Sequence, residues 1–209
     1  MFKITKKSLD LNKEISEKME GKTFHFHTHI LYDIRTSIGK TSVVKYLEIG
    51  AYAGGSASLM CSHPYQTNCF SVDLSYPIDQ VVVERNVNKF KKENNSFEYI
   101  KGNSQSVDTV NFVKEKVGMV DILFIDGDHS KAGAIADYLN YSPLVKRGGY
   151  LIFDDYLDSL HSPEVKLAVD EIVEKESPEN YEIIGSLKYD LLPSFTHLCA
   201  SNLFIFRKK

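Results

Sequence analysis

Residues 48–56 read E-I-G-A-Y-A-G-G-S, and this stretch decides the fold that the sequence predicts. The overlapping segment V-V-K-Y-L-E-I-G at 43–50 is β-branched and apolar, as in a buried strand, and A-S-L-M at 57–60 begins a helix. Glycine between them lets the backbone turn sharply and approach a ligand closely. The pattern therefore predicts a strand, a ligand-holding turn and a helix.

Strand and helix patterns alternate through the rest of the chain. Apolar segments at 68–73, 97–104, 120–126 and 147–156 are separated by segments with helical spacing of apolar residues. Repeated β–α units predict an α/β protein with a Rossmann-like, doubly wound, mostly parallel sheet of seven strands and helices on both faces. The last two strands are expected at 181–187 and 202–207, with only a loop between them. They are most simply an antiparallel pair at one edge of the sheet.

Three of the helices are predicted from particular residues. Ile78, Val81, Val82 and Phe90 lie roughly on one helical face, and Pro77 is well placed for a helix start. Val107, Val110, Val113 and Val117 form a second apolar face that ends near Gly118. Ser-Pro-Glu at 162–164 is typical of a helix cap before a third.

The first 40 residues are expected to form an N-terminal helical extension or cap, and residues 41–209 the main domain. Leu9, Leu11, Ile15 and Met19 predict a short amphipathic helix at 7–20. Next, His25, His27 and His29 alternate, so in a strand all would share one face. Three interpretations stay open for them: a structural metal site, the rim of a substrate pocket, or polar surface.

Composition narrows the class of partner. The formal net charge is −3 and no polybasic face is evident, which argues against nucleic acid and anionic membrane and favours a small molecule. Cys61, Cys69 and Cys199 lack C-x-x-C spacing and are expected to be buried thiols. With no signal-peptide pattern and no apolar run near the roughly 20 residues of a membrane span, we expect a cytoplasmic protein. The sequence does not decide the oligomeric state, and a homo-oligomer is one possibility.

Asp73 ends the second strand, where a carboxylate can accept hydrogen bonds from ribose hydroxyls. The glycine spacing at 50–55 is not the G-x-G-x-x-G of pyrophosphate-binding turns. Together the two features favour a nucleoside-bearing cofactor that does not need a pyrophosphate. The alternatives are a purely structural glycine turn and an aspartate that caps a helix.

Carboxylates follow two central strands. Asp126 comes after V-D-I-L-F-I, and Asp154 and Asp155 come after Y-L-I-F. Crowded like charges need a cation or must take up protons, and oxygen ligands suit Mg²⁺. Asp128 and His129 could then receive a proton from a substrate hydroxyl. In the alternative interpretation these two residues serve only the turn and the start of a helix.

Five segments together resemble the class I S-adenosylmethionine-dependent methyltransferases. They are L-E-I-G-A-Y-A-G-G-S at 47–56, S-V-D-L at 71–74, G-N-S at 102–104, D-I-L-F-I-D-G-D-H-S at 121–130 and R-G-G-Y-L-I-F-D-D-Y at 147–156. Within that class the chain is most similar to the small-molecule O-methyltransferases that include macrolide-sugar and aminocoumarin O-methyltransferases and cephalosporin-hydroxylase-like proteins. The last two segments are the specific ones, whereas the glycine turn indicates only the superfamily.

The resemblance implies a role for each matching residue. Glu48, Gly50 and Gly54 would contact the methionine part of the cofactor, Asp73 its ribose, and Asn103 and Ser104 its adenine. The full set of implied cofactor contacts is Glu48, Gly50, Ala51, Tyr52, Gly54, Ser56, Asp73, Leu74, Asn103, Ser104 and Asp126. It also implies Mg²⁺ on Asp126, Asp154 and Asp155, and a base at His129 or Asp128.

The sequence thus predicts Mg²⁺-assisted methyl transfer from S-adenosylmethionine to a hydroxyl of a small molecule such as a sugar, glycoside or catechol-like acceptor. The N-terminal part is only about 40 residues long, so the acceptor cannot be inferred from relatives. One alternative is a nucleotide-dependent Rossmann-like oxidoreductase, which the missing G-x-G-x-x-G disfavours. The other is a non-catalytic protein that binds S-adenosylmethionine or acts in assembly.

Overall fold

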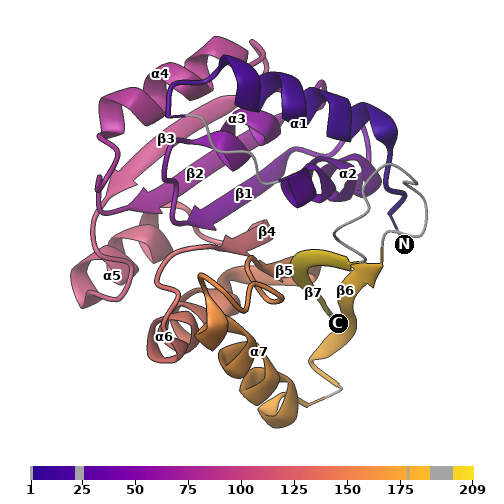
Figure 1. Ribbon diagram of the computed structural model, residues 1–209, viewed down its shortest axis with the longest axis vertical. Helices are drawn as coiled ribbons and strands as arrows, with labels where there is room; N and C mark the ends of the chain where they lie inside the picture. Colours follow the sequence, from indigo (N-terminus) through magenta and orange to yellow (C-terminus); the bar gives the residue numbers. More distant parts are fainter. Residues whose placement is uncertain (1, 22–25, 178, 189–199) are drawn as a thin grey trace.

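The computed structural model describes residues 2–21, 26–177, 179–188 and 200–209 (Figure 1). Its helices are α1 (Lys6–Lys18), α2 (His29–Ile38), α3 (Gly55–Cys61), α4 (Gln80–Phe90), α5 (Val107–Lys116), α6 (Lys131–Tyr141) and α7 (Pro163–Lys175), with 3₁₀ turns η1 (Phe26–Thr28) and η2 (Ser142–Leu144). Its strands are β1 (Val44–Ile49), β2 (Thr67–Asp73), β3 (Ser96–Lys101), β4 (Val120–Ile125), β5 (Val145–Phe153), β6 (Tyr181–Lys188) and β7 (Ala200–Lys208).

The seven strands form one sheet in the order β3-β2-β1-β4-β5-β7-β6. Strands β1 to β5 are parallel, and β7 is antiparallel to both β5 and β6. This confirms the predicted fold class, including the antiparallel pair at one edge. The strand order reverses between β1 and β4, and ligands of such sheets bind beyond the carboxyl ends of the strands at that point.

Helices cover both faces of the sheet. On one face α5, α6 and α7 pack against residues such as Leu47, Leu123 and Leu151. On the other face α2, α3 and α4 pack against alternate residues of the same strands, such as Tyr46 and Ile122. This alternation follows from the two-residue period of a strand. Because both faces are buried, the central strands are apolar on both sides, as the sequence predicted.

The N-terminal helices are fastened to the sheet layer by buried polar groups. Asp33 of α2 accepts hydrogen bonds from the Thr5 amide and hydroxyl and from the Ser8 hydroxyl, at 2.6–3.0 Å. After α1, Asn86 of α4 accepts from the Glu20 amide at 2.9 Å and donates to the carbonyl of Ala53 in the glycine turn at 2.9 Å. The amphipathic helix predicted at 7–20 therefore exists, and it is fixed at both of its ends. The boundary expected at residue 40 stays a prediction.

Two local expectations are wrong. The alternating histidines do not lie on a strand, because η1 and the start of α2 occupy this segment, and buried His27 and His29 are not polar surface. His25 lies outside the described residues. The face of α4 is also different: Val83 and Val87 are buried, whereas Val81 is exposed. Asp79 accepts the Val81 amide at 2.8 Å and starts the helix three residues later than a start at Pro77 would.

The cysteines agree with the sequence where they are described. Cys61 and Cys69 are free and buried, and Cys199 lies outside the described residues. Among the described helices, none has the length and apolarity that crossing a membrane requires.

One fully buried arginine, Arg35, connects α2 to the N-terminal ends of β1 and β2. The Arg35 guanidinium donates to the Thr67 hydroxyl and to the carbonyls of Gly39, Ser42 and Gln66, at 2.9–3.0 Å. All four acceptors belong to loops or to the start of β2. The side chain therefore joins the end of α2 to the segments that lead into β1 and β2.

Replacement of Arg35 by methionine should destabilise the protein strongly. It removes four hydrogen bonds that a fully buried guanidinium donates, and hydrogen bonds to charged groups contribute about 1.5–3 kcal/mol each. We expect the free energy of unfolding to fall by about 3 kcal/mol or more in urea titrations. The control is Arg85→Met, because exposed Arg85 pairs with exposed Glu20 at 2.6 Å, and such surface pairs contribute about 1 kcal/mol at most. Equal effects of both substitutions would contradict this account.

Candidate functional site

The glycine turn after β1 brings two strand ends into backbone contact. Gly50 has φ +90°, and a Cβ at this position would lie 1.9 Å from the carbonyl oxygen of Asp126. Only glycine fits such an approach. Gly54 has φ +81° and precedes α3, and a Cβ there would meet Val83 of α4 at 3.0 Å. The first glycine therefore permits contact with β4, and the second permits packing of α3 on α4.

Glu48 is fully buried below this turn. Its carboxylate accepts hydrogen bonds from the hydroxyls of Tyr46 at 2.7 Å, Ser56 at 2.6 Å and Ser71 at 2.6 Å. Burial raises the pKa of Glu48 to about 7, although these hydroxyl donors lower it. Because the side chain has no exposed surface, it can influence a bound molecule only through Ser56, which reaches the cavity.

Asp73 fastens the turn from the neighbouring strand. Its Oδ2 accepts the amides of Ala51 at 2.8 Å and Tyr52 at 3.3 Å. Its Oδ1 accepts the amide of Ser75 at 2.6 Å and the hydroxyl of Tyr99 at 3.0 Å. The carboxylate thus holds the turn in shape and also lines the cavity.

A cavity of about 640 Å³ opens beyond the carboxyl ends of the parallel strands. It falls within the range of roughly 300–1,000 Å³ that is usual for small-molecule sites. Most of the predicted cofactor residues line it: Gly50, Ala51, Tyr52, Ser56, Asp73, Leu74, Asn103, Ser104 and Asp126. Glu48 and Gly54 do not, since one lies below the floor and the other behind the turn.

The opposite wall of the cavity comes from the N-terminal segment. It consists of Asn12, Ile15 and Ser16 of α1, of Met19 directly after this helix, and of Thr28 of η1. The residues of α1 recur at spacings of three and four, so they share the face that also packs on the domain. Helical periodicity could have found this face, but it could not have shown that the face lines a cavity.

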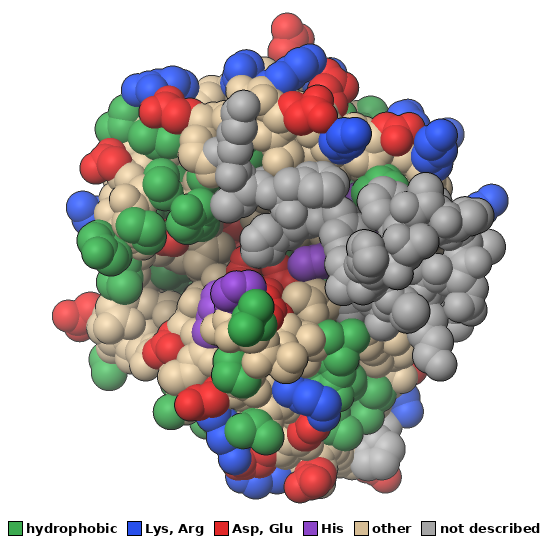
Figure 2. Space-filling view, in the orientation of Figure 1, with side chains coloured by type: hydrophobic (Ala, Val, Ile, Leu, Met, Phe, Trp, Pro, Cys, Tyr) green, Lys and Arg blue, Asp and Glu red, His purple; other side chains and the backbone are tan. Residues whose placement is uncertain are grey.

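Carboxylates gather beside the cavity because β4 and β5 are parallel and in register. Ile125 pairs with Phe153, so Asp126 and Asp154 leave the sheet side by side. Among the described residues, Asp126, His129 and Asp155 each place one possible ligand atom within 4.8 Å of the others. Figure 2 shows acidic side chains at the bottom of a hollow, with histidine side chains beside them. Two of the three predicted metal ligands, Asp126 and Asp155, therefore lie together with His129, whereas Asp154 is not part of this group and its Oδ1 contacts His27 and the Asp155 amide instead.

His129 faces two carboxylates of this cluster. Its Nε2 lies 3.4 Å from Asp126 Oδ1 and 3.4 Å from Asp155 Oδ2. The hydrogen bond that protonated His129 donates to Asp126, together with the charges of the surrounding carboxylates, raises the pKa of His129, and burial offsets part of the rise. Burial, together with repulsion from Asp154, raises the pKa of Asp126 to about 7. When protonated, His129 would thus offset part of the carboxylate charge at this position.

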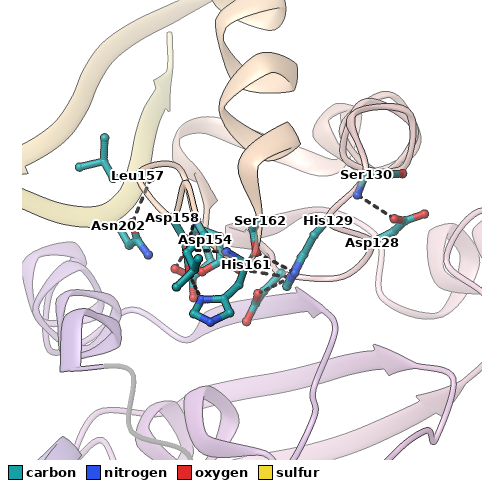
Figure 3. Close-up of polar contacts among 12 residues, drawn as sticks. Asp128, His129, Ser130, Asp154, Leu157, Asp158, His161, Ser162 and Asn202 are labelled. Atoms are coloured by element: carbon teal, nitrogen blue, oxygen red, sulfur yellow. Dashed lines mark hydrogen bonds and ion pairs between the residues drawn. The ribbon is translucent and has the colours of Figure 1, made fainter.

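Ser162 orients both His129 and Asp155. Its hydroxyl lies 2.7 Å from Asp155 Oδ2 and 3.0 Å from His129 Nδ1 (Figure 3). An ionised Asp155 can only accept, so the hydroxyl donates to it and accepts from His129 Nδ1. Ser162 occupies the N-cap position of α7 but makes no side-chain cap bond. The cap predicted from Ser-Pro-Glu is therefore replaced by contacts within the site.

Asp128 is directed away from this group (Figure 3). It accepts the Ser130 amide at 2.9 Å and the Gln105 side-chain amide at 3.1 Å. The Ser130 amide, with smaller contributions that include Gln105, lowers the pKa of Asp128. Gly133 makes room for it, because a Cβ there would lie 2.2 Å from the Asp128 carboxyl carbon. The surroundings of the two candidate bases thus act in opposite directions: the pKa of His129 is raised, and the pKa of Asp128 is lowered.

A further buried acid, Asp137 of α6, lies beneath the turn that follows β4. Its Oδ2 would be 3.2 Å from a Cβ at Gly127, and neither of its oxygens has a hydrogen-bond partner among the described residues. Burial raises the pKa of Asp137 to about 6, and the charge of Asp128 adds to the rise while Ser104 offsets part of it. Sequence reasoning missed this residue, because a single aspartate on a helix has no distinguishing pattern.

Comparison with known proteins identifies the family. Residues 47–156 match the family model described as a methyltransferase domain, which covers more than half of the chain. The chain belongs to this methyltransferase family. It is also 37% identical over 179 residues to the uncharacterized protein R132 of Acanthamoeba polyphaga mimivirus, covering 83% of this chain and 80% of that protein. The alternative hypothesis of a nucleotide-dependent oxidoreductase is therefore wrong.

Solved structures share the methyltransferase fold. The O-methyltransferase NovP superposes with a TM-score of 0.68 at 16% identity, covering 96% of this chain and 98% of NovP. MycE, a methyltransferase from the mycinamycin biosynthetic pathway solved with Mg and SAH, gives 0.63 at 17% identity. That match covers 96% of this chain but 54% of MycE. The chain therefore spans about half the length of MycE.

The ionisation of Asp137 should make the methyltransferase domain less stable as pH rises. Its pKa is higher in the folded protein than the ordinary value of 3.8, so its contribution is fully present below about pH 4 and is lost as pH rises through 6. A shift of about two units corresponds to about 3 kcal/mol. Urea unfolding at pH 4 and pH 7.5 should show this loss in wild type and not in Asp137→Asn. Exposed Asp170→Asn is the control, and parallel pH profiles of all three proteins would contradict the assignment.

Proposed function

We propose that this methyltransferase transfers the methyl group of S-adenosylmethionine to a hydroxyl of a small molecule, with the assistance of Mg²⁺. The observation that carries the proposal is the position of Asp126 and His129. Both residues line the cavity and both belong to the carboxylate cluster. A cofactor in the cavity and an acceptor at the cluster would therefore meet at this shared edge, which is the alignment that an in-line displacement requires.

The cofactor would lie along the carboxyl ends of β1, β2 and β3. Its methionine part would contact the Gly50 turn and the Ser56 hydroxyl, and its ribose would approach Asp73. Asn103 and Ser104, after β3, would lie by the adenine. Glu48 would act through Ser56, whose hydroxyl donates its proton to that carboxylate and so presents its lone pairs to an ammonium group.

The residues at the ends of β4 and β5 fit a divalent cation. The charges of Asp154 and Asp155 add to the effect of burial in raising the pKa of Asp126, so the three carboxylates are close enough to repel one another. Carboxylate oxygens are the ligands that Mg²⁺ prefers. When bound there, Mg²⁺ would lower the pKa of an acceptor hydroxyl and offset the negative charge that develops on it. MycE was solved with Mg, SAH and mycinamycin VI, which supports a small acceptor with vicinal oxygens, such as a sugar, glycoside or catechol.

His129 suits the role of base better than Asp128. The Ser162 hydroxyl accepts from Nδ1 of His129, and Nε2 faces Asp126 and Asp155. Protonated Nε2 would donate to these carboxylates. Once a bound cation offsets their charge, Nε2 would lose its proton, and its lone pair would be able to take the proton of the acceptor hydroxyl. Asp128 has a lowered pKa and points toward Gln105. We therefore assign removal of the acceptor proton to His129 and keep Asp128 as a residue that holds the turn. A non-catalytic binding protein is the second candidate, but it would have no use for this arrangement.

Divalent cations should be needed for methyl transfer but not for cofactor binding. Turnover would be measured against a panel of catechols and glycosides with Mg²⁺ and with EDTA. Because a bound cation supplies several kcal/mol at the transition state, we expect a loss on the order of 100-fold or more in EDTA and in Asp155→Asn. Asp170→Asn, on the surface of α7, is the matched control. Full turnover in EDTA would remove the metal from the mechanism.

The Ser56 hydroxyl should contribute to cofactor affinity. Hydrogen bonds to charged groups contribute about 1.5–3 kcal/mol, so Ser56→Ala should weaken binding of S-adenosylhomocysteine by roughly 10-fold or more in isothermal titration calorimetry. Glu48→Gln should have an effect in the same direction, because an amide can donate to Ser56 and reverse its polarity. Ser96→Ala, at the opposite end of the sheet, is the control. Unchanged affinity in both site variants would exclude the proposed contact.

A further inference from the structure

The side chain of His27 reaches Asp154, the carboxylate that directly precedes Asp155 after β5, from the N-terminal segment. Its Nε2 lies 2.7 Å from Asp154 Oδ1, and the two side chains are 7% and 1% exposed. An ionised carboxylate can only accept, so His27 donates this hydrogen bond. The same Oδ1 also accepts the backbone amide of Asp155 at 2.8 Å. The orientation of the Asp154 carboxylate is therefore set by a residue more than one hundred positions earlier in the chain.

We propose that His27 is a positioning residue, which holds Asp154 in the orientation that binding of a divalent cation requires. This inference rests on the proposed metal site. Asp126 and Asp155 repel Asp154, and a carboxylate under such repulsion turns away unless a donor holds it. The contact of 2.7 Å has the length of a strong, charge-assisted hydrogen bond. Partners of this kind, which orient a metal ligand from behind, typically change metal affinity by about 10–100-fold.

The position of His27 is fixed by the helices around it. The turn η1 contacts α1, α2 and β7. On one side of His27, the Thr28 hydroxyl donates to Asn12 Oδ1 of α1 at 3.3 Å. On the other, His29 begins α2, whose Asp33 holds the start of α1 through Thr5 and Ser8. The imidazole therefore comes from a braced segment, and it can impose a direction on Asp154.

A purely structural role accounts less well for this pair. Burying an imidazole and a carboxylate costs desolvation energy, and apolar residues of similar volume often stabilise a core equally well. A contact made only for stability would have no reason to lie on the carboxylate next to Asp126 and Asp155. The same N-terminal segment lines the cavity through Asn12 and Thr28. It therefore contributes to both halves of the proposed site.

The test uses Mn²⁺ as the probe and the full chain. Binding would be measured by electron paramagnetic resonance of free Mn²⁺, and cofactor-site integrity by calorimetry with S-adenosylhomocysteine. We expect His27→Ala to weaken Mn²⁺ binding by about 10–100-fold and to leave the affinity for S-adenosylhomocysteine within about twofold. His27→Gln should restore much of the Mn²⁺ affinity, since its amide nitrogen can occupy the place of Nε2. His161→Ala is the matched control, because His161 is exposed and pairs with Asp158 at 3.1 Å.

The outcomes separate this inference from the proposed function. Wild-type Mn²⁺ affinity in His27→Ala overturns the positioning role and leaves the metal site standing. No Mn²⁺ binding by the wild-type protein overturns the metal site, and the role of His27 with it. If His27→Ala does not fold, His27→Asn replaces it, because its shorter amide does not reach Asp154. Wild-type affinity in that variant would also overturn the inference.

Discussion

Repulsion among carboxylates at the ends of β4 and β5 is the constraint on which the rest of the site depends. Because these strands are parallel and Ile125 pairs with Phe153, Asp126 and Asp154 follow the two strands at neighbouring positions. Burial raises the pKa of Asp126 to about 7, and repulsion from the neighbouring carboxylate of Asp154 adds to the rise. Two histidines from distant parts of the chain, His27 and His129, donate toward the cluster. The polar groups around the site are best understood as compensation for this crowding.

The glycine turn and the acidic strand end are one structural unit. Because the carbonyl of Asp126 lies where a side chain of residue 50 would start, only a glycine at the end of β1 lets β4 approach so closely. The backbone amide of Asp126 also donates to the carbonyl of Ile49 at 2.8 Å. A shift of this turn, where we propose that the cofactor binds, would therefore also shift the carboxylate at the proposed cation site. This coupling keeps the two proposed reactants in a fixed relation.

The sequence predicted those features of the fold and the site that depend on local sequence patterns. The strands, the order of β–α units and the side chains at strand ends, such as Asp73 and Asp126, follow from hydrophobic period and from the geometry of parallel sheets. His27, Ser162 and Asn12 reach the site through the folding of the chain back across the strand ends, and no spacing in the sequence records that path. Ser162 was even predicted for a different task, because its sequence context is that of a helix cap.

The N-terminal segment, up to the start of α2, contributes to both parts of the proposed site. MycE is about twice as long as the part of it that this chain matches, yet the cavity here already has two walls. The second wall comes from α1, and the adjacent turn brings His27 to the cluster. Because the same helices fix both, a substitution that reshapes the wall of the cavity also moves the imidazole that contacts Asp154. Acceptor selection and cation binding are therefore expected to change together, and the N-terminal segment is where that linkage resides.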